Sequence, residues 1–480
     1  MAHKTNKISK KTRNYLHMSF FFCNFAPSNG IQMKNKATIL LFVGVLALVT
    51  LAGTRVYKMT ADRASDQAAV AVKPGIEVLR ERGYDVLQGK RVGLVTNPTG
   101  VDRQLKSTID ILAEAPEVNL VALYGPEHGV RGNAHAGDHV GNGTDERTGL
   151  PTYSLYGKTR KPTPEMLEGV DVLVYDIQDN GCRSYTYIST LGMLLETCAE
   201  QDIELVVLDR PNPLGGRKIE GCIAEEGYIS FVSQYNIPYL YAQTPGELAL
   251  MVNAEAKERW EADSAQVLAD SISMKKNGVL FKPCRLTVIP MEGWHRDMLW
   301  EDTGLEWVVA SPHVQTGHTA YFYPQTGILG EFGFFNIGVG YTLPFELLGA
   351  DWIDAQLLAD SMNALGLPGL IFRPIYYQPF YSVFQGEQIQ GVQIHLMDFD
   401  AACLTSVQFH LLEMLNKLYP EHRFFEECDP KRFRMFDIVC GTGFVREQFA
   451  KTYRWADIAE YWMKDVEAYR VRSSKYYLYE

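Results

Sequence analysis

Four short apolar runs in the first half of the chain alternate with segments of helical periodicity. Each run has the length of a buried strand. The runs cover residues 91–96, 120–124, 170–175 and 204–208. Helices are predicted after two of them, at residues 108–114 and 187–201. Unbroken apolar strands separated by helices are typical of a mostly parallel sheet with helices on both faces, so the pattern predicts an α/β domain of this kind.

The regular alternation stops after residue 289, and the sequence then becomes rich in aromatic residues and glycine. Further helices are predicted around residues 406–418 and 458–469, with a β-prone run at 391–396. We therefore expect a smaller α+β domain after a boundary near residue 300. We expect an N-terminal extension with a signal or anchor segment at residues 1–58 and a linker at residues 59–73. A Rossmann-like sheet domain is expected at residues 74–300, and the smaller domain at residues 301–480.

The N-terminal extension contains an apolar run at residues 37–53 in which only Thr38 and Thr50 are polar. Basic residues flank this run on both sides, as they do in export signals and signal anchors. We therefore expect the rest of the chain to be exported, and to work in the periplasm or anchored on the outer side of the membrane. Contact with the membrane is expected only through this segment, if it is not cleaved.

Polar side chains follow directly where the apolar runs end. In parallel sheets, ligands bind at the carboxyl ends of the strands. Any one of these residues could be a turn or cap residue, but several strands that end in this way favour a site at this edge of the sheet. The residues are Asn97, Glu127, His128, Asp176, Gln178, Asp179, Asp209 and Asn212. By contrast, Glu247 in Thr244-Pro245-Gly246-Glu247 is interpreted only as the cap of a further helix.

Several classes of function are disfavoured by the sequence. A net charge of −11 without a basic cluster in the body of the chain argues against a nucleic-acid partner. The first predicted strand is not followed by a Gly-x-Gly-x-x-Gly turn, and the chain has neither a Walker-type loop nor a Gly-x-Ser-x-Gly motif. The cysteines show no paired spacing. The sequence therefore predicts no nucleotide cofactor, no serine hydrolase and no structural zinc site.

A metal-dependent hydrolase remains an alternative, with His128, His135 and His139 as the possible ligands. A metal site needs ligands held in a fixed geometry, whereas the segment around His135 and His139 is rich in glycine. We therefore expect no metal.

Glycoside hydrolysis fits the residues that remain at the strand ends. It requires a carboxylic acid that protonates the leaving oxygen and a carboxylate that stabilises or traps the oxocarbenium ion. Clustered acids also raise one another's pKa, as a proton donor requires. The sequence offers carboxylates, arginines and aromatic residues for this site, namely Glu127, Asp176, Asp179, Asp209, Arg131, Arg183, Arg210, Tyr185 and Tyr187.

Several blocks of the sequence resemble the signature blocks of the NamZ-type exo-β-N-acetylmuramidases. The most specific are Gly-Pro-Glu-His-Gly at residues 125–129 and Asp-Ile-Gln-Asp at residues 176–179. Related blocks lie at residues 94–100, 148–156 and 209–216, and the resemblance extends over about residues 74–480. It implies a Rossmann-like domain, a smaller C-terminal domain with the active cleft between the two, and release of terminal N-acetylmuramic acid from peptidoglycan fragments.

The resemblance also implies roles for individual residues. Glu127 corresponds to the catalytic carboxylate, and we expect His128 and Asp176 to take part in catalysis with it. The expected substrate-binding residues are Asn97, Arg131, Gln178, Asp179, Arg183, Tyr185, Asp209, Asn212 and Glu331. A non-catalytic sugar-binding protein on the same scaffold is the main alternative.

The chain departs from the family pattern at residues 331–334 and 338–341, which read Glu-Phe-Gly-Phe and Gly-Val-Gly-Tyr. The family typically has Glu-Gly-Thr-Asn and Gly-Arg-Gly-Thr there, and a His-Gly pair where this chain has Tyr241-Ala242. The aromatic residues Phe332, Phe334 and Tyr341 either stack on the sugar and alter specificity, or pack between the domains.

Overall fold

The computed structural model describes residues 72–127, 129–132, 142–157, 159–270, 275–276, 279–280 and 282–480. The predicted signal or anchor segment, His128, His135 and His139 lie outside these ranges. None of the helices in the described part of the chain is both long enough and apolar enough to cross a bilayer.

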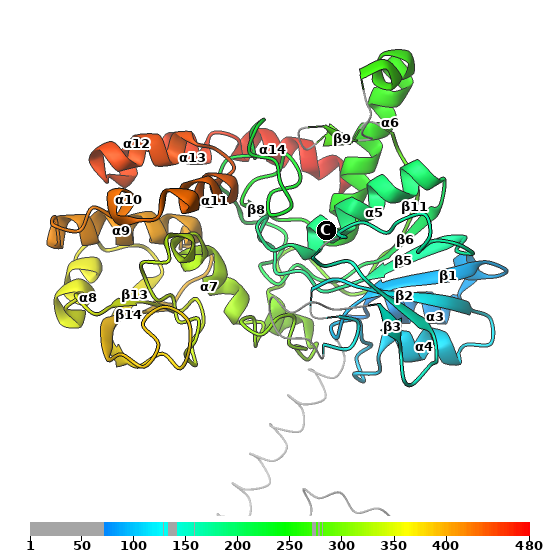
Figure 1. Cartoon of the computed structure of the whole chain (residues 1–480), viewed down its shortest axis with the longest axis horizontal. Coiled ribbons are helices and arrows are strands. Elements are labelled where there is room, and N and C mark those ends of the chain that lie inside the picture. The colour runs from blue at the N-terminus through cyan, green and yellow to red at the C-terminus, as the bar shows by residue number, and fades with distance from the viewer. Residues whose placement is uncertain are drawn as a thin grey trace, which may run out of the picture. The chain divides into compact units, whose positions relative to one another are not determined.

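A seven-stranded sheet forms the first domain, with the strand order β11-β6-β5-β1-β2-β4-β3 (Figure 1). The predicted apolar runs form its centre as β1 (Arg91–Thr96), β2 (Asn119–Gly125), β5 (Val172–Asp176) and β6 (Glu204–Leu208). The outer strands are β11 (Arg285–Ile289), β4 (Pro151–Ser154) and β3 (Gly143–Thr144). Among these strands only β3 and β4 pair in antiparallel fashion, so the predicted mostly parallel sheet is confirmed.

Helices cover both faces of the sheet. Helices α3 (Gly75–Glu81) and α4 (Thr108–Glu114) lie on one face, and α5 (Tyr187–Gln201) and α6 (Pro245–Asp270) lie on the other (Figure 1). Side chains alternate between the two layers: Val206 packs in the core beneath α3 and α4, while Val207 packs in the core beneath α5 and α6. Burial on both faces explains why the strands read as unbroken apolar runs.

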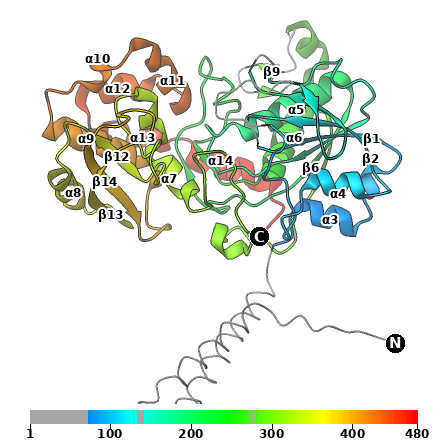
Figure 2. The ribbon, with the colours of Figure 1, turned by 60° about the horizontal axis from the view of Figure 1, so that its bottom comes forward.

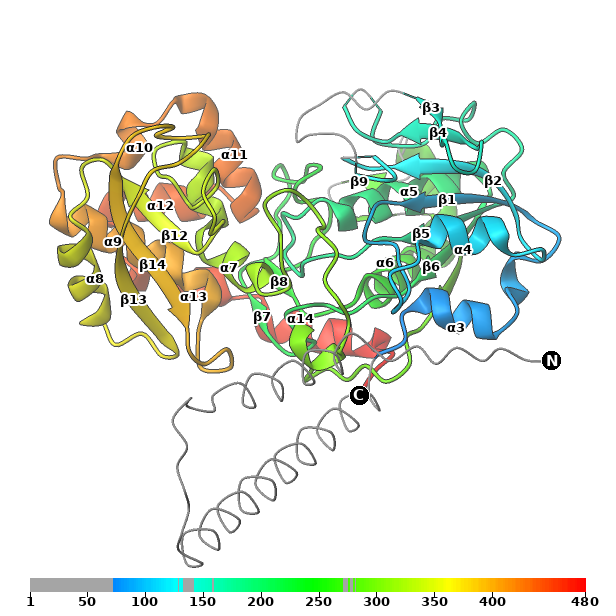
Figure 3. The same ribbon diagram turned by 90° about the horizontal axis from the view of Figure 1, so that it is seen from below.

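The smaller domain contains a three-stranded antiparallel sheet, β12-β14-β13, which Figure 3 shows beside α8 and α9. Its strands are β12 (Leu347–Ala350), β13 (Leu370–Tyr377) and β14 (Ile389–Leu396). Its longer helices are α7 (Thr319–Thr326), α8 (Ala355–Asn363), α9 (Val407–Leu418), α11 (Pro430–Cys440) and α12 (Phe444–Thr452). The predicted α+β character of this part is confirmed. The boundary near residue 300 stays a prediction.

The predicted helix at residues 458–469 is two shorter helices, α13 (Ala459–Met463) and α14 (Val466–Ser473). The break falls at Lys464 and Asp465. The Asp465 carboxylate accepts a hydrogen bond from the backbone N–H of Ile223 at 3.0 Å, so the break is fixed by a contact with the first domain. Helical periodicity alone does not reveal such a contact.

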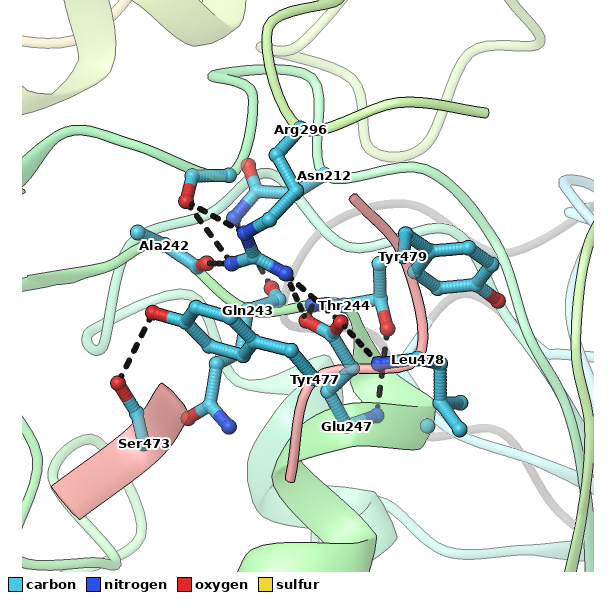
Figure 4. Close-up of polar contacts among 12 residues, drawn as sticks. Asn212, Ala242, Gln243, Thr244, Glu247, Arg296, Ser473, Tyr477, Leu478 and Tyr479 are labelled. Atoms are coloured by element: carbon cyan, nitrogen blue, oxygen red, sulfur yellow. Dashed lines mark hydrogen bonds and ion pairs between the residues drawn. The ribbon is translucent and has the colours of Figure 1, made fainter. Parts of the chain in front are cut away.

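The last residues of the chain return to the first domain, where α14 leads to the C-terminus (Figure 2). The capping box at the start of α6 is confirmed, because Thr244 and Glu247 each accept a hydrogen bond from the other's backbone N–H at 3.2 Å. Glu247 also forms a buried ion pair with Arg296 at 2.7 Å and accepts from the N–H of Leu478 at 2.9 Å (Figure 4). The hydroxyl of Tyr479 donates to Asp209 at 2.6 Å. The C-terminal residues are therefore part of the first domain's interior.

Candidate functional site

Glu127 stands on a tight turn at the carboxyl end of β2. The N–H of Gly129 donates to the carbonyl of Pro126 at 3.0 Å and closes this turn. Gly129 has a φ of +76°, which favours glycine, and a Cβ atom at Gly125 would lie 2.8 Å from the backbone nitrogen of Val130. The glycines of the Gly-Pro-Glu-His-Gly block thus permit the sharp turn that brings Glu127 to the end of the sheet.

Glu127 lines a cavity of about 240 Å³. One wall comes from the residues just before α5 and from the first residue of α5. The other wall comes from the segment before α7, from α7 and from the segment before β12. Besides Glu127, the lining residues are Ser184, Tyr185, Thr186, Tyr187, Ser311, Pro312, His313, Val314, Tyr323 and Phe345. Glu127 is the only carboxylate among the described lining residues. The arrangement places one acid among aromatic and hydroxyl side chains.

Two tyrosines, Tyr156 and Tyr187, lie near the Glu127 carboxylate. Burial raises the pKa of Tyr156, and a hydrogen bond to Glu127 raises it further. Burial also raises the pKa of Tyr187, with a smaller contribution from the Glu127 charge. The Tyr185 ring meets the rings of Tyr187 and Tyr323 edge to face, at 5.0 and 5.8 Å between centroids. These rings form an aromatic wall of the kind that accommodates a sugar.

Two buried polar groups near this cavity, the amide nitrogen of Asn97 and the hydroxyl of Tyr185, make no hydrogen bond of good geometry in the described part of the chain. Asn97 interacts weakly with Tyr187, and Tyr185 interacts weakly with Ser311. Buried polar groups in folded proteins are almost always well paired, so such weakly paired groups next to a cavity are suited to a polar ligand. Asn97 is oriented by its own turn, because its side-chain oxygen accepts from the N–H of Thr99 at 3.0 Å. Asn97, Glu127, Tyr185 and Tyr187 are thus the predicted residues that the fold places close to this site.

Asp176 is held in a buried ion pair away from the lining of this cavity. Its Oδ1 lies 2.5 Å from Arg210 Nε, and its Oδ2 lies 3.0 Å from Arg210 Nη2. The hydroxyl of Thr108 donates to the same Oδ2 at 2.5 Å. Both carboxylate oxygens therefore have partners inside the sheet domain. Asp176, which the sequence predicted as a catalytic residue, thus links the end of β5 to α4 through Thr108 and to the residues after β6 through Arg210.

Asp179 and Asp209 are also buried. Burial raises the pKa of each to about 7. Asp179 accepts from the N–H of Gly181 at 2.7 Å and from the hydroxyl of Tyr241. Asp209 accepts from the N–H of Gly246 at 2.8 Å, and therefore fixes the start of α6. Neither residue lines the cavity at Glu127.

Arg183 uses all five of its N–H groups within the protein. Nη1 donates to the carbonyls of Cys222 and Ile237, at 2.7 and 2.6 Å, and Nη2 donates to the carbonyls of Val439 and Cys440 at the end of α11. Nε donates to the hydroxyl of Ser233 at 3.3 Å. Arg183 therefore connects the first domain to α11 and has no donor left for a substrate.

The remaining predicted residues do not line the cavity at Glu127, namely Gln178, Asn212, Arg131 and Glu331. Gln178 donates to the carbonyl of Pro211 at 2.6 Å, and Asn212 donates to that of Gln243 at 3.0 Å, so both stabilise the loops at the strand ends. Arg131 is ion-paired with Asp145 at 2.5 Å and lines a different cavity. Burial raises the pKa of Glu331, and the positive charge of Arg432 opposes this shift.

The aromatic residues of the divergent segment pack inside the smaller domain. The ring of Phe332 contacts those of Phe425 and Phe436, each at 5.1 Å, and the ring of Phe334 contacts that of Phe424 at 6.0 Å. Residues 332–341 do not line the cavity at Glu127. Core packing, rather than sugar stacking, is therefore the role of Phe332 and Phe334.

Sequence reasoning missed several residues of the cavity. Tyr156 does not line the cavity but interacts with Glu127, and it belongs to one of the blocks that carry the family resemblance, so its position in that block was an available signal. Ser311, His313 and Tyr323 come from an irregular segment and a short helix without a motif, so no comparable signal marks them in the sequence. Among the described residues, no group of three or more His, Cys, Asp or Glu side chains is placed to hold a metal ion.

Comparisons with known proteins agree with this architecture. Residues 92–318 match the family model described as exo-β-N-acetylmuramidase NamZ, N-terminal, and residues 321–479 match the corresponding C-terminal model. A peptidoglycan β-N-acetylmuramidase NamZ from Bacillus subtilis (strain 168) is 41% identical over 408 residues, which are 85% of this chain and 91% of that protein.

Two crystal structures of DUF1343 family proteins from Bacteroides fragilis NCTC 9343 are similar to this chain. One is 55% identical with a TM-score of 0.79, and covers 86% of this chain and 100% of its own. The other is 28% identical with a TM-score of 0.64, and covers 85% of this chain and 99% of its own. Together with the two family models, these similarities show that the chain belongs to the NamZ family of exo-β-N-acetylmuramidases.

Proposed function

We propose that this glycoside hydrolase releases terminal N-acetylmuramic acid from peptidoglycan fragments, with Glu127 as its acid–base residue. Family membership and the activity named for the Bacillus subtilis relative support the substrate class. The observation that carries the proposal is the position of Glu127 as the carboxylate of a cavity walled by tyrosines. Such a cavity supplies the proton donor that glycoside hydrolysis requires, and its tyrosine rings take the charge-stabilising role that a second carboxylate has in other glycosidases.

In this mechanism the Glu127 carboxyl group donates its proton to the glycosidic oxygen as the bond to the anomeric carbon breaks. The leaving sugar departs as an alcohol, and Glu127 becomes a carboxylate. That carboxylate then takes a proton from the water molecule whose oxygen bonds to the anomeric carbon, which restores the acid. Tyr156 orients the Glu127 carboxyl group through its hydroxyl. The faces of the tyrosine rings stabilise the positive charge that develops on the sugar.

The acetamido and hydroxyl groups of the sugar need polar partners in the cavity. Asn97 and Tyr185 are proposed for this role, because each has a buried polar atom that makes no hydrogen bond of good geometry within the described ranges. Arg183 is not proposed as the partner of the substrate's carboxylate, since its five N–H groups already have acceptors.

Export is proposed from the sequence alone. The apolar run at residues 37–53 with basic flanks has the pattern of a signal or anchor segment. Peptidoglycan fragments occur outside the cytoplasmic membrane, so an exported location fits the proposed substrate.

The test compares Glu127→Gln with the unaltered protein, using glycosides of N-acetylmuramic acid and N-acetylglucosamine as substrates. The amide keeps the shape of the side chain but cannot transfer the proton, so we expect a rate at least about a hundredfold lower. Glu117→Gln is the matched control, because Glu117 is exposed before β2 and should be replaceable without effect. An unchanged rate in Glu127→Gln would remove Glu127 from the mechanism. Binding of the sugar by the unaltered protein without turnover would favour a sugar-binding protein.

A further inference from the structure

The loop between β13 and β14 presents two large aromatic side chains to solvent. Phe380 is 66% exposed and Tyr381 is 48% exposed. The ring of Tyr341 stacks on that of Phe380, with 5.7 Å between centroids and 28° between planes. We call Tyr341, Phe380 and Tyr381 the aromatic platform. Exposed apolar surface of this kind commonly marks a binding site when neighbouring residues share it.

The backbone holds the aromatic platform in place. The N–H of Phe380 donates to the carbonyl of Gly340 at 2.7 Å, and a Cβ atom at Gly340 would lie 1.9 Å from the carbonyl oxygen of Tyr381. Ser382 and Phe384 have φ values of +72° and +63°, which are unfavourable for residues other than glycine. Such strain is concentrated at functional sites.

The aromatic platform adjoins the cavity at Glu127. The hydroxyl of Tyr381 lies 2.9 Å from Nε2 of His313, within hydrogen-bond distance, and the two rings are 6.0 Å apart. His313 lines the cavity together with Glu127. His313 therefore belongs to the wall of the cavity and also contacts the aromatic platform.

The size of the cavity limits what it can hold. Its volume of about 240 Å³ is smaller than the roughly 300–1,000 Å³ of typical sites for drug-sized ligands, so it accommodates about one sugar residue. A glycan substrate must extend beyond the cavity, over the surface next to it. Aromatic rings suit this role because the apolar C–H face of a sugar packs on a ring while its hydroxyl groups stay in water.

From these observations we infer that the aromatic platform binds the sugar on the leaving-group side of the cleaved bond. This inference rests on the proposed function and adds a second sugar-binding position to it. Phe380 and Tyr341 supply the stacking surface. Tyr381 positions His313 between the cavity and the aromatic platform. The expected ligand is an uncharged or weakly charged sugar ring of the peptidoglycan chain.

The test compares two substrates with the same cleaved sugar. One is a disaccharide in which N-acetylmuramic acid is joined to a second amino sugar, and the other is N-acetylmuramyl fluoride, whose leaving group has no ring. For Phe380→Ala we expect kcat/KM to fall about tenfold for the disaccharide and to stay unchanged for the fluoride. Ile371→Ala is the matched control, because Ile371 is 49% exposed at the other end of β13. It should leave both values unchanged.

A binding measurement separates substrate binding from catalysis. In the Glu127→Gln background, adding Phe380→Ala should raise the Kd of the disaccharide about tenfold. Equal values of kcat/KM for Phe380→Ala and the unaltered protein on the disaccharide, or an equal decrease for both substrates, would overturn the inference and leave the proposed function standing. If the unaltered protein hydrolyses neither substrate, the proposed function fails and the inference fails with it.

Discussion

Asp176 and Arg210 form a two-point ion pair in which Nε lies 2.5 Å from Oδ1 and Nη2 lies 3.0 Å from Oδ2. The carboxylate at the end of β5 is thus matched by the arginine that follows β6. Parallel strands bring these residues together although they are 34 positions apart in the sequence. The pair is buried, so each charge depends on the other for compensation.

We expect Asp176→Asn to destabilise the fold rather than to abolish catalysis. The substitution leaves the Arg210 charge buried without its partner, which costs about 3–5 kcal/mol in comparable buried pairs. Urea unfolding should show this loss, while kcat of the folded fraction stays close to that of the unaltered protein. Glu127→Gln is the contrasting variant, with the rate lost and the stability kept. A hundredfold loss of kcat in Asp176→Asn with an unchanged unfolding midpoint would instead place Asp176 in the chemistry.

Asp179 is expected to make stability depend on pH in the direction opposite to that of most carboxylates. Burial raises its pKa from 3.8 to about 7 in the folded protein. Between these values the folded state holds the proton that the unfolded state has released. The free energy of unfolding therefore falls as pH rises from about 4 to about 7. Asp209 contributes in the same direction, since burial also raises its pKa to about 7.

In Asp179→Asn the free energy of unfolding should fall less as pH rises, because the amide does not titrate. Its oxygen can accept the hydrogen bonds from Gly181 and Tyr241 that Asp179 accepts through Oδ2. Urea unfolding at pH 5 and pH 8 measures the effect. The difference in the free energy of unfolding between these two pH values should be roughly 1–4 kcal/mol smaller in the variant than in the unaltered protein. An identical pH dependence in the variant and the unaltered protein would mean that Asp179 does not titrate in this window.

Arg183→Lys is expected to lower stability and to leave substrate affinity unchanged. The guanidinium group reaches five acceptors that come from several segments of the chain, and a lysine ammonium group cannot reproduce this fork. Loss of two or more hydrogen bonds of a charged group should cost at least about 3 kcal/mol. The matched control is Arg432→Lys, because Arg432 is exposed and donates to one carbonyl at 3.2 Å.

The measurements for Arg183→Lys are the urea midpoint and KM. If Arg183 instead held the carboxylate of the substrate, KM would rise while the urea midpoint stayed the same. That result would contradict the structural role, which the packing at Gly441 supports: a Cβ atom there would lie 2.6 Å from Nη2 of Arg183.

The sequence by itself determined the strands, the polar residues that end them and the position of Glu127. These features are local. Apolar runs of strand length specify β1, β2, β5 and β6, because each must be buried on both faces of a parallel sheet. The turn at Gly125 and Gly129 then places Glu127 at the carboxyl edge. The capping box at Thr244 is likewise readable, since its partners are three residues apart.

Only the tertiary structure decided which of the polar strand-end residues face the cavity. Asp176, Asp209 and Arg183 look equivalent to Glu127 in the sequence, but a buried charge must find partners, and theirs come from distant segments. The partners of Asp209 and Arg183 include Tyr479 and Cys440. The same holds for the opposite wall, where His313 is brought to the cavity by the packing of the second domain rather than by any local pattern. Pairing and cavity formation depend on contacts between residues that are from 34 to 270 positions apart, and no short window of the sequence contains both partners.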